Sequence, residues 1–125
     1  AGVLGNRQAW IDQIVEASRA TDEPIWQLPL ERTRYRKLLD SDIADLKNIG
    51  GPYGGAITAA VFLSEFVGDT PWAHLDIAGQ MKVDADDSWR SKGATGFGAR
   101  LLAELAAGFT APTADAADGR RPATA

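Results

Sequence analysis

Residues 72–81 read Trp-Ala-His-Leu-Asp-Ile-Ala-Gly-Gln-Met, and apolar and polar side chains alternate from Ala73 to Ile77. In an extended strand successive side chains point to opposite faces, so one face of this stretch is wholly apolar. That face consists of Ala73, Leu75 and Ile77. The other face carries the only histidine of the chain, His74, two residues from the carboxylate of Asp76. The pattern predicts a central strand with one face in the core and a polar pair on the other.

Apolar residues recur at the spacing of an amphipathic helix in several other stretches. The first helix is predicted to begin at Asn6, whose side chain can cap it by accepting a backbone N–H bond, and to end by about Glu23 because Pro24 follows. Residues 25–28 predict a short extended piece. Further helices are predicted over residues 31–39, with their basic side chains in solvent, and over residues 56–67 and 99–107.

The predicted helix over residues 56–67 is apolar nearly all round, which is typical of a buried helix. We expect it to lie against the sheet with Gly68 as its C-cap, and the glycine-rich residues 50–55 before it indicate close packing. The 125 residues are 45% hydrophobic and include four tryptophans, which is sufficient for one domain with a core. Strands and helices together predict an α/β domain.

Charge and composition exclude several classes of function. The 13 basic and 17 acidic residues give a net charge of −4 with no basic block outside the tail, which argues against a nucleic-acid partner. No apolar run approaches the ~20 residues of a membrane span, so no membrane association is expected. The absence of cysteine excludes disulfides and thiolate chemistry and is compatible with the cytoplasm. Residues 109–125 have almost nothing to bury and are predicted to be a disordered tail.

Three features invite a chemical interpretation. His74 beside Asp76 resembles the base and orienting acid of a catalytic dyad, but no serine lies on a nucleophile elbow, so a structural pair is favoured. Residues 93–98 are glycine-rich and precede a helix, as in phosphate-binding loops, but they lack a Walker lysine, so a tightly packed loop is favoured. The aspartates in residues 40–45 and 84–87 lack the other ligands of a calcium loop and are interpreted as exposed carboxylates.

Six segments of the chain, taken in order and spacing, resemble the C-terminal end of the leucyl aminopeptidase family, the dinuclear-metal aminopeptidases of the cytosol. The segments are AGVLGN (residues 1–6), WQLPL (26–30), SDIADLKN (41–48), GGAITAAVFL (54–63), WAHLDIAG (72–79) and KGATG (92–96). The resemblance covers residues 1–108. It implies the C-terminal portion of the catalytic domain, with a partial mixed sheet flanked by helices, followed by the tail over residues 109–125.

The resemblance also implies an activity and its partners. Members of the family are metal-dependent exopeptidases that release N-terminal residues from peptide substrates, with leucine among the preferred residues, and they assemble as homohexamers. Two divalent ions, manganese or zinc, act with a catalytic arginine. The motifs that supply these groups precede the point at which this chain begins, so we expect no catalytic residue and no metal ligand within it. The chain is then a fragment of the enzyme and inactive by itself.

What remains for this chain, carried over position by position, is the wall of the substrate pocket. Ala78 and Met81 match positions lining the pocket for the N-terminal side chain, and Ile49 matches one lining the pocket for the next residue. A small residue leaves room for a branched aliphatic group, and a flexible thioether adapts to its shape. Ordinary core packing is the alternative for each. The alternative for the whole chain is a non-enzymatic binding or scaffold domain that reuses the fold.

Overall fold

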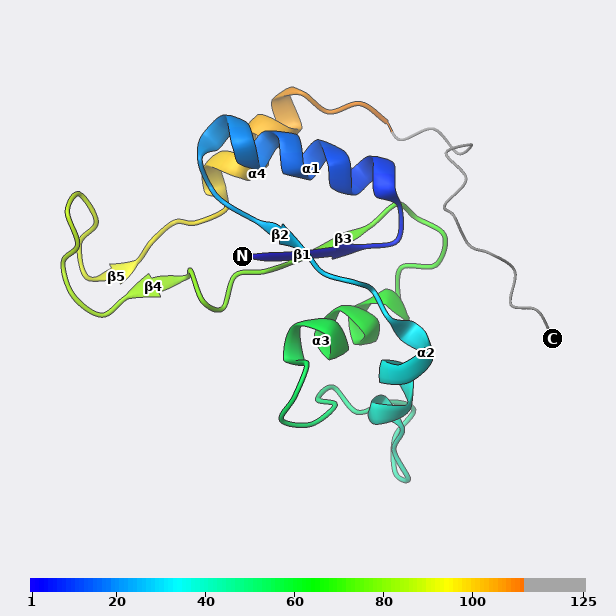
Figure 1. Cartoon of the computed structure of the whole chain (residues 1–125). Helices are drawn as coiled ribbons and strands as arrows, with labels where there is room; N and C mark the ends of the chain where they lie inside the picture. Colours follow the sequence, from blue (N-terminus) through cyan, green and yellow to red (C-terminus); the bar gives the residue numbers. More distant parts are fainter. Residues whose placement is uncertain (112–125) are drawn as a thin grey trace.

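The computed structural model describes residues 1–111, in which helices lie on both faces of a small sheet (Figure 1). The elements, in order, are β1 (Gly2–Gly5), α1 (Gln8–Thr21), β2 (Trp26–Gln27), α2 (Arg32–Tyr35), the 3₁₀ helix η1 (Arg36–Leu39), α3 (Gly55–Ser64), β3 (Ala73–Asp76), β4 (Lys82–Val83), β5 (Gly93–Ala94) and α4 (Ala99–Ala107). The sheet order is β2-β1-β3, with β1 parallel to β2 and antiparallel to β3. The predicted α/β class and mixed sheet are confirmed.

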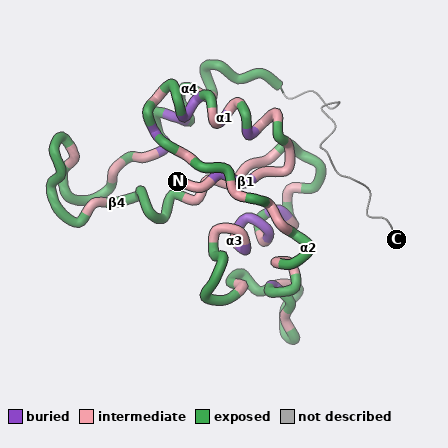
Figure 2. The backbone as a smooth tube through the Cα atoms, in the orientation of Figure 1, coloured by how far each residue is buried: buried purple, intermediate pink, exposed green. Residues whose placement is uncertain are grey.

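β1 is the centre of the packing because it is buried on both faces. Val3 and Leu4 are both fully buried, and successive strand residues point in opposite directions. On one face Val3 joins a cluster with residues of α1 and α4, and on the other β1 contacts α3. Figure 2 shows the buried positions gathered where these helices meet the strand. Because Ala73 and Leu75 of β3 pack against the same cluster, the predicted inward face of this strand is confirmed at these two positions.

The prediction that residues 72–81 form a central strand is wrong, because β1 lies between β2 and β3 and β3 is at the edge of the described sheet. β3 is also shorter than the alternation predicts. β3 ends at Asp76, and the chain then turns, with the N–H of Gln80 donating to the carbonyl of Ile77 at 2.8 Å. The Asp76 carboxylate accepts the N–H of Ala78 at 3.1 Å, so this side chain satisfies a backbone group of the turn. Ile77 is 37% exposed and does not complete the apolar face.

Asn6 does not cap the first helix. The N-cap of α1 is Arg7, with no side-chain bond, and α1 ends at Thr21 with Asp22 in the left-handed conformation. The Asn6 amide instead donates to the carbonyl of Thr70 and accepts the N–H of Trp72, both at 2.8 Å. The side chain therefore joins the end of β1 to the segment that enters β3.

The sequence predicted that the basic side chains of the second helical segment lie in solvent, but two of them form ion pairs with a glutamate just after another helix. The segment divides into α2 and η1, and Arg32 and Arg36 both form ion pairs with Glu65, just beyond the end of α3. Arg32 also donates to the Ser64 hydroxyl at 2.8 Å. These contacts fasten α2 to α3. Leu39 is fully buried, whereas Leu38 is 44% exposed.

α3 is buried on one face only, although its sequence is apolar nearly all round. Thr58, Ala60 and Val61 are buried, whereas Leu63 is 40% exposed and Phe66, beyond the helix, is 69% exposed. The reason is that, within residues 1–111, α3 packs against the sheet and against α2 and η1 but has no second layer over its outer side. Two further predictions about this helix are wrong. It ends at Ser64 rather than residue 67, and the residue after it, not Gly68, occupies the C-cap position.

The chain beyond α4 contacts α1 through Phe109 and Thr110. The ring of Phe109 packs edge-on against Trp10 at 5.6 Å, and Gln13 exchanges two hydrogen bonds with the backbone of Thr110. Residues 112–125, the greater part of the predicted disordered tail, lie outside the described residues. Across residues 1–111, no helix combines the length and the apolar content that crossing a bilayer requires.

Candidate functional site

The three positions expected to line the substrate pocket lie in two loops. Ala78 and Met81 belong to the exposed turn over residues 77–81, which joins β3 to β4 and is called the 77–81 turn below. Ile49 lies in the loop between η1 and α3. All three side chains are exposed, Met81 to 50% and Ile49 to 71%. The fold thus brings Ala78 and Met81 together, and it leaves all three side chains free to contact a ligand or another part of a larger protein.

The 77–81 turn is fastened by a residue from a later element. Thr95, directly after β5, donates its N–H to the carbonyl of Met81 at 3.0 Å and its hydroxyl to the carbonyl of Gln80 at 2.5 Å. The same hydroxyl accepts the N–H of Phe97 at 3.2 Å. β4 and β5 extend this contact as an antiparallel pair. A cavity of about 200 Å³ adjoins the turn through Gln80 and Thr95.

The loop over residues 93–98 is anchored by a buried carboxylate. Glu23, which is 4% exposed, accepts the N–H groups of Gly98 and Leu101 at 3.1 and 2.9 Å. These are donors of the first turn of α4, which a phosphate ion would otherwise use. Arg100 lies 3.5 Å from the other carboxylate oxygen. The chain's own glutamate therefore occupies the helix terminus. This contact favours the interpretation of residues 93–98 as a packed loop and not as a phosphate-binding loop.

The contacts of His74 and Asp76 support the structural interpretation of this pair. The imidazole stacks on the ring of Trp72, with centroids 6.4 Å apart and planes inclined by 21°. The Asp76 carboxylate is bonded to the backbone of Ala78. Each side chain thus holds local structure, and neither contact orients the imidazole toward a nucleophile as a catalytic dyad requires.

The described residues do not fit a dinuclear metal centre. Within residues 1–111 no three side chains of histidine, cysteine, aspartate or glutamate lie close enough together to hold a metal ion. Four of the aspartates considered for calcium have other partners. Asp40 pairs with Arg36, Asp84 with Lys82 and Asp87 with Arg90, while Asp86 accepts the N–H of Lys92. No metal-dependent step can be derived from this part of the chain.

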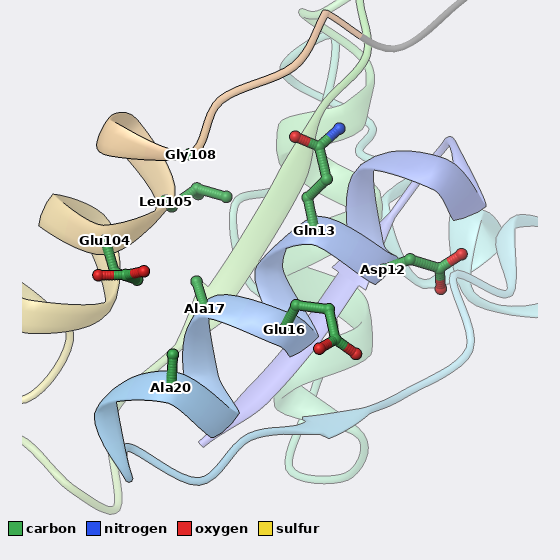
Figure 3. Close-up of a pocket in the computed structure, with 8 residues that line it drawn as sticks. All are labelled: Asp12, Gln13, Glu16, Ala17, Ala20, Glu104, Leu105 and Gly108. Atoms are coloured by element: carbon green, nitrogen blue, oxygen red, sulfur yellow. The ribbon is translucent and has the colours of Figure 1, made fainter.

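A separate cavity of about 410 Å³ lies between α1 and α4 (Figure 3). Its floor includes Ala17 and Ala20, whose small side chains leave the space open. Figure 3 shows the carboxylates of Asp12 and Glu16 on α1 directed away from that of Glu104 on α4. Asp12 accepts the amide of Gln8, and Glu16 pairs with Arg19. The acidic groups of this cavity therefore do not converge on a ligand position.

Comparison with known proteins identifies the class and then the family. Residues 1–103 match the family model described as "Cytosol aminopeptidase family, catalytic domain", a class of peptidases. The chain belongs to the cytosol aminopeptidase family. The resemblance found in the sequence is thereby confirmed, and it holds over most of the chain.

Relatives with known names agree with this result. A "Probable cytosol aminopeptidase" of Allorhizobium ampelinum is 50% identical over 105 residues, which is 84% of this chain and 21% of the relative. Proteins of the same name from Brucella melitensis and Alkaliphilus metalliredigens are 49% and 46% identical over 84% and 83% of the chain. The chain spans about a fifth of the length of these relatives.

Sequence reasoning missed the side chains that hold the site together. Glu23 was predicted only as the end of a helix, and Thr95 only as part of a glycine-rich loop. Their partners lie 75 and 15 residues away, so local periodicity carries no signal for them. The composition of the loop offered one hint, since a helix with glycine at its N-cap must satisfy its first N–H groups by other means.

Proposed function

We propose that this chain is the C-terminal part of the catalytic domain of a metal-dependent aminopeptidase that releases N-terminal amino acids, leucine among them, from peptides. The observation that carries the proposal is the family match over residues 1–103, together with relatives named as aminopeptidases. Those names favour an enzyme over the scaffold domain that the sequence left open. They also support a cytoplasmic location, and the resemblance supports a homohexamer.

In this proposal the chain contributes recognition of the substrate side chain. Ala78 and Met81 form part of the pocket for the N-terminal residue, and Ile49 part of the pocket for the next one. Their exposure supports this role, because a side chain that packs in a core is not free to contact a substrate. The small methyl group of Ala78 leaves space for a branched aliphatic side chain, and Met81 adapts to its shape.

The metal ions of the proposed enzyme, two manganese or zinc ions, are held by residues outside this chain. This assignment is supported by the lack of a fitting side-chain cluster within residues 1–111 and by the fraction of the relatives' length that the chain spans. The chain by itself is then inactive, because it supplies part of the binding surface without the groups that cleave the bond.

Ala78→Leu in the complete enzyme tests the proposed pocket. The larger side chain fills space that a leucine side chain needs, so kcat/KM for a leucine amide should fall about tenfold or more relative to kcat/KM for an alanine amide. Ala103→Leu, on the exposed side of α4, is the matched control and should leave the ratio unchanged. Equal losses for the two substrates would remove Ala78 from the specificity pocket.

A further inference from the structure

We propose that Thr95 is a positioning residue that fixes the 77–81 turn, and with it the substrate specificity of the pocket that Ala78 and Met81 line. This inference rests on the proposed function. It goes beyond it by assigning a role to a side chain that does not itself line the pocket.

Apolar packing does not fix the 77–81 turn. Every residue from 77 to 82 is exposed, so no buried side chain holds the backbone at this point. The position of the turn therefore depends on hydrogen bonds, whose directional geometry restrains backbone position.

Hydrogen bonds hold the turn at both ends. At its start the Asp76 carboxylate accepts the N–H of Ala78 at 3.1 Å. At its end Thr95 binds two consecutive carbonyls, those of Gln80 and Met81, through its hydroxyl and its N–H. The hydroxyl is the only side-chain group in the second pair of contacts, and it restrains the residue immediately before Met81.

Thr95 is itself held by contacts that lead into the core. Its hydroxyl accepts the N–H of Phe97, and the next residue, Gly98, donates to the buried Glu23. Leu101, which donates to the same carboxylate, is fully buried in the cluster beneath α1. Hydrogen bonds at both ends of the short segment from Thr95 to Gly98 thus connect the packed α1–α4 core to an exposed turn. Such bonds can place a pocket wall without contacting the substrate.

Thr95→Val in the complete enzyme tests this role, because valine keeps the shape of threonine and removes the hydroxyl. Loss of one restraining hydrogen bond should lower the leucine-to-alanine ratio of kcat/KM about fivefold, mainly by raising KM for the leucine amide. Thr95→Ser restores the hydroxyl and should restore the ratio. Thr33→Val, at an exposed position of α2, is the matched control and should behave as the unmodified enzyme.

The outcomes separate this inference from the proposed function. If the unmodified enzyme hydrolyses neither amide, the proposed function is wrong, and the inference fails with it. If Ala78→Leu shifts the ratio but Thr95→Val does not, only the positioning role of Thr95 is wrong. A loss that is equal for the two substrates, or that serine does not rescue, also contradicts it. Should the valine variant not fold, Asp76→Ala removes the restraint at the other end of the turn and should lower the same ratio, with Asp76→Asn as its control.

Discussion

The isolated 125-residue chain, supplied with manganese or zinc, is expected to hydrolyse a leucine amide no faster than the metal salt alone. The rate acceleration of an enzyme is on the order of 10⁶ or more, so this is the largest effect that we predict. The physical reason is that residues 1–111 bring no three metal-binding side chains together, and Asp40, Asp84 and Asp86 are bonded to basic side chains or a backbone N–H group. The measurement is release of leucine with and without each metal.

A contaminating peptidase from the expression host is the main source of error in that assay. Ala78→Leu provides the control, because activity that belongs to the chain should change its leucine-to-alanine ratio with this variant, whereas host activity should not. Metal-dependent turnover that responds to Ala78→Leu would show that the chain holds its own catalytic centre, contrary to our proposal.

Glu23→Ala is expected to lower the free energy of unfolding by about 2–4 kcal/mol, because it leaves two N–H groups without the charged carboxylate that accepts their hydrogen bonds. The carboxylate is 4% exposed and bonded to the N–H groups of Gly98 and Leu101, so water cannot readily replace it. The loss should also loosen α4 from α1, because Glu23 follows one helix and caps the other. Urea denaturation followed by circular dichroism measures the change.

Two variants show whether burial and hydrogen bonding account for this effect. Glu23→Gln keeps an oxygen acceptor, so it should lower the free energy of unfolding clearly less than Glu23→Ala does. Glu16→Ala removes an exposed carboxylate, whose ion pair with Arg19 has both side chains at least 70% exposed, and should cost less than about 0.5 kcal/mol. If Glu23→Ala lowered the free energy of unfolding by no more than Glu16→Ala does, the capping contact would make no measurable contribution to stability.

Local patterns predicted the elements that local interactions determine. α4 was predicted over the residues at which it is found, because apolar spacing and the glycines at positions 98 and 108 mark both of its ends. The short β2 likewise falls inside its predicted stretch, which Pro24 and Pro29 delimit. In these cases the sequence around the element contains the information that sets its bounds.

The remaining differences arise from contacts between distant parts of the chain. Asn6 has the chemistry of a helix cap, yet its amide is used by the backbone at residues 70 and 72. Alternation continues through Ile77, yet β3 ends at Asp76, which pairs with Gly2, the first residue of the distant strand β1. Arg32 and Arg36 look like solvent-facing charges until the fold brings Glu65 beside them. A residue's chemistry was predictable in each case, but its partner was not.

For the candidate site, too, the sequence indicated individual residues and the structure shows their contacts. Periodicity alone gave no reason to single out Ala78, Met81 or Ile49, and they were selected through the family resemblance. The structure adds that the first two share one exposed turn, and it identifies the hydrogen bonds from Thr95 that hold this turn. Neither the family resemblance nor the structure places the three side chains around a substrate, because the greater part of the relatives' length lies outside this chain.

The most direct measurement is a crystal structure of the complete enzyme with manganese, located by its anomalous scattering, and a leucine-like inhibitor. We predict that the inhibitor's side chain contacts Ala78 and Met81, while every ligand of each ion comes from outside these 125 residues. An ion bound by a side chain of this chain, or an inhibitor far from the 77–81 turn, would contradict the proposal that this chain lines the substrate pocket while residues outside it bind the metal ions.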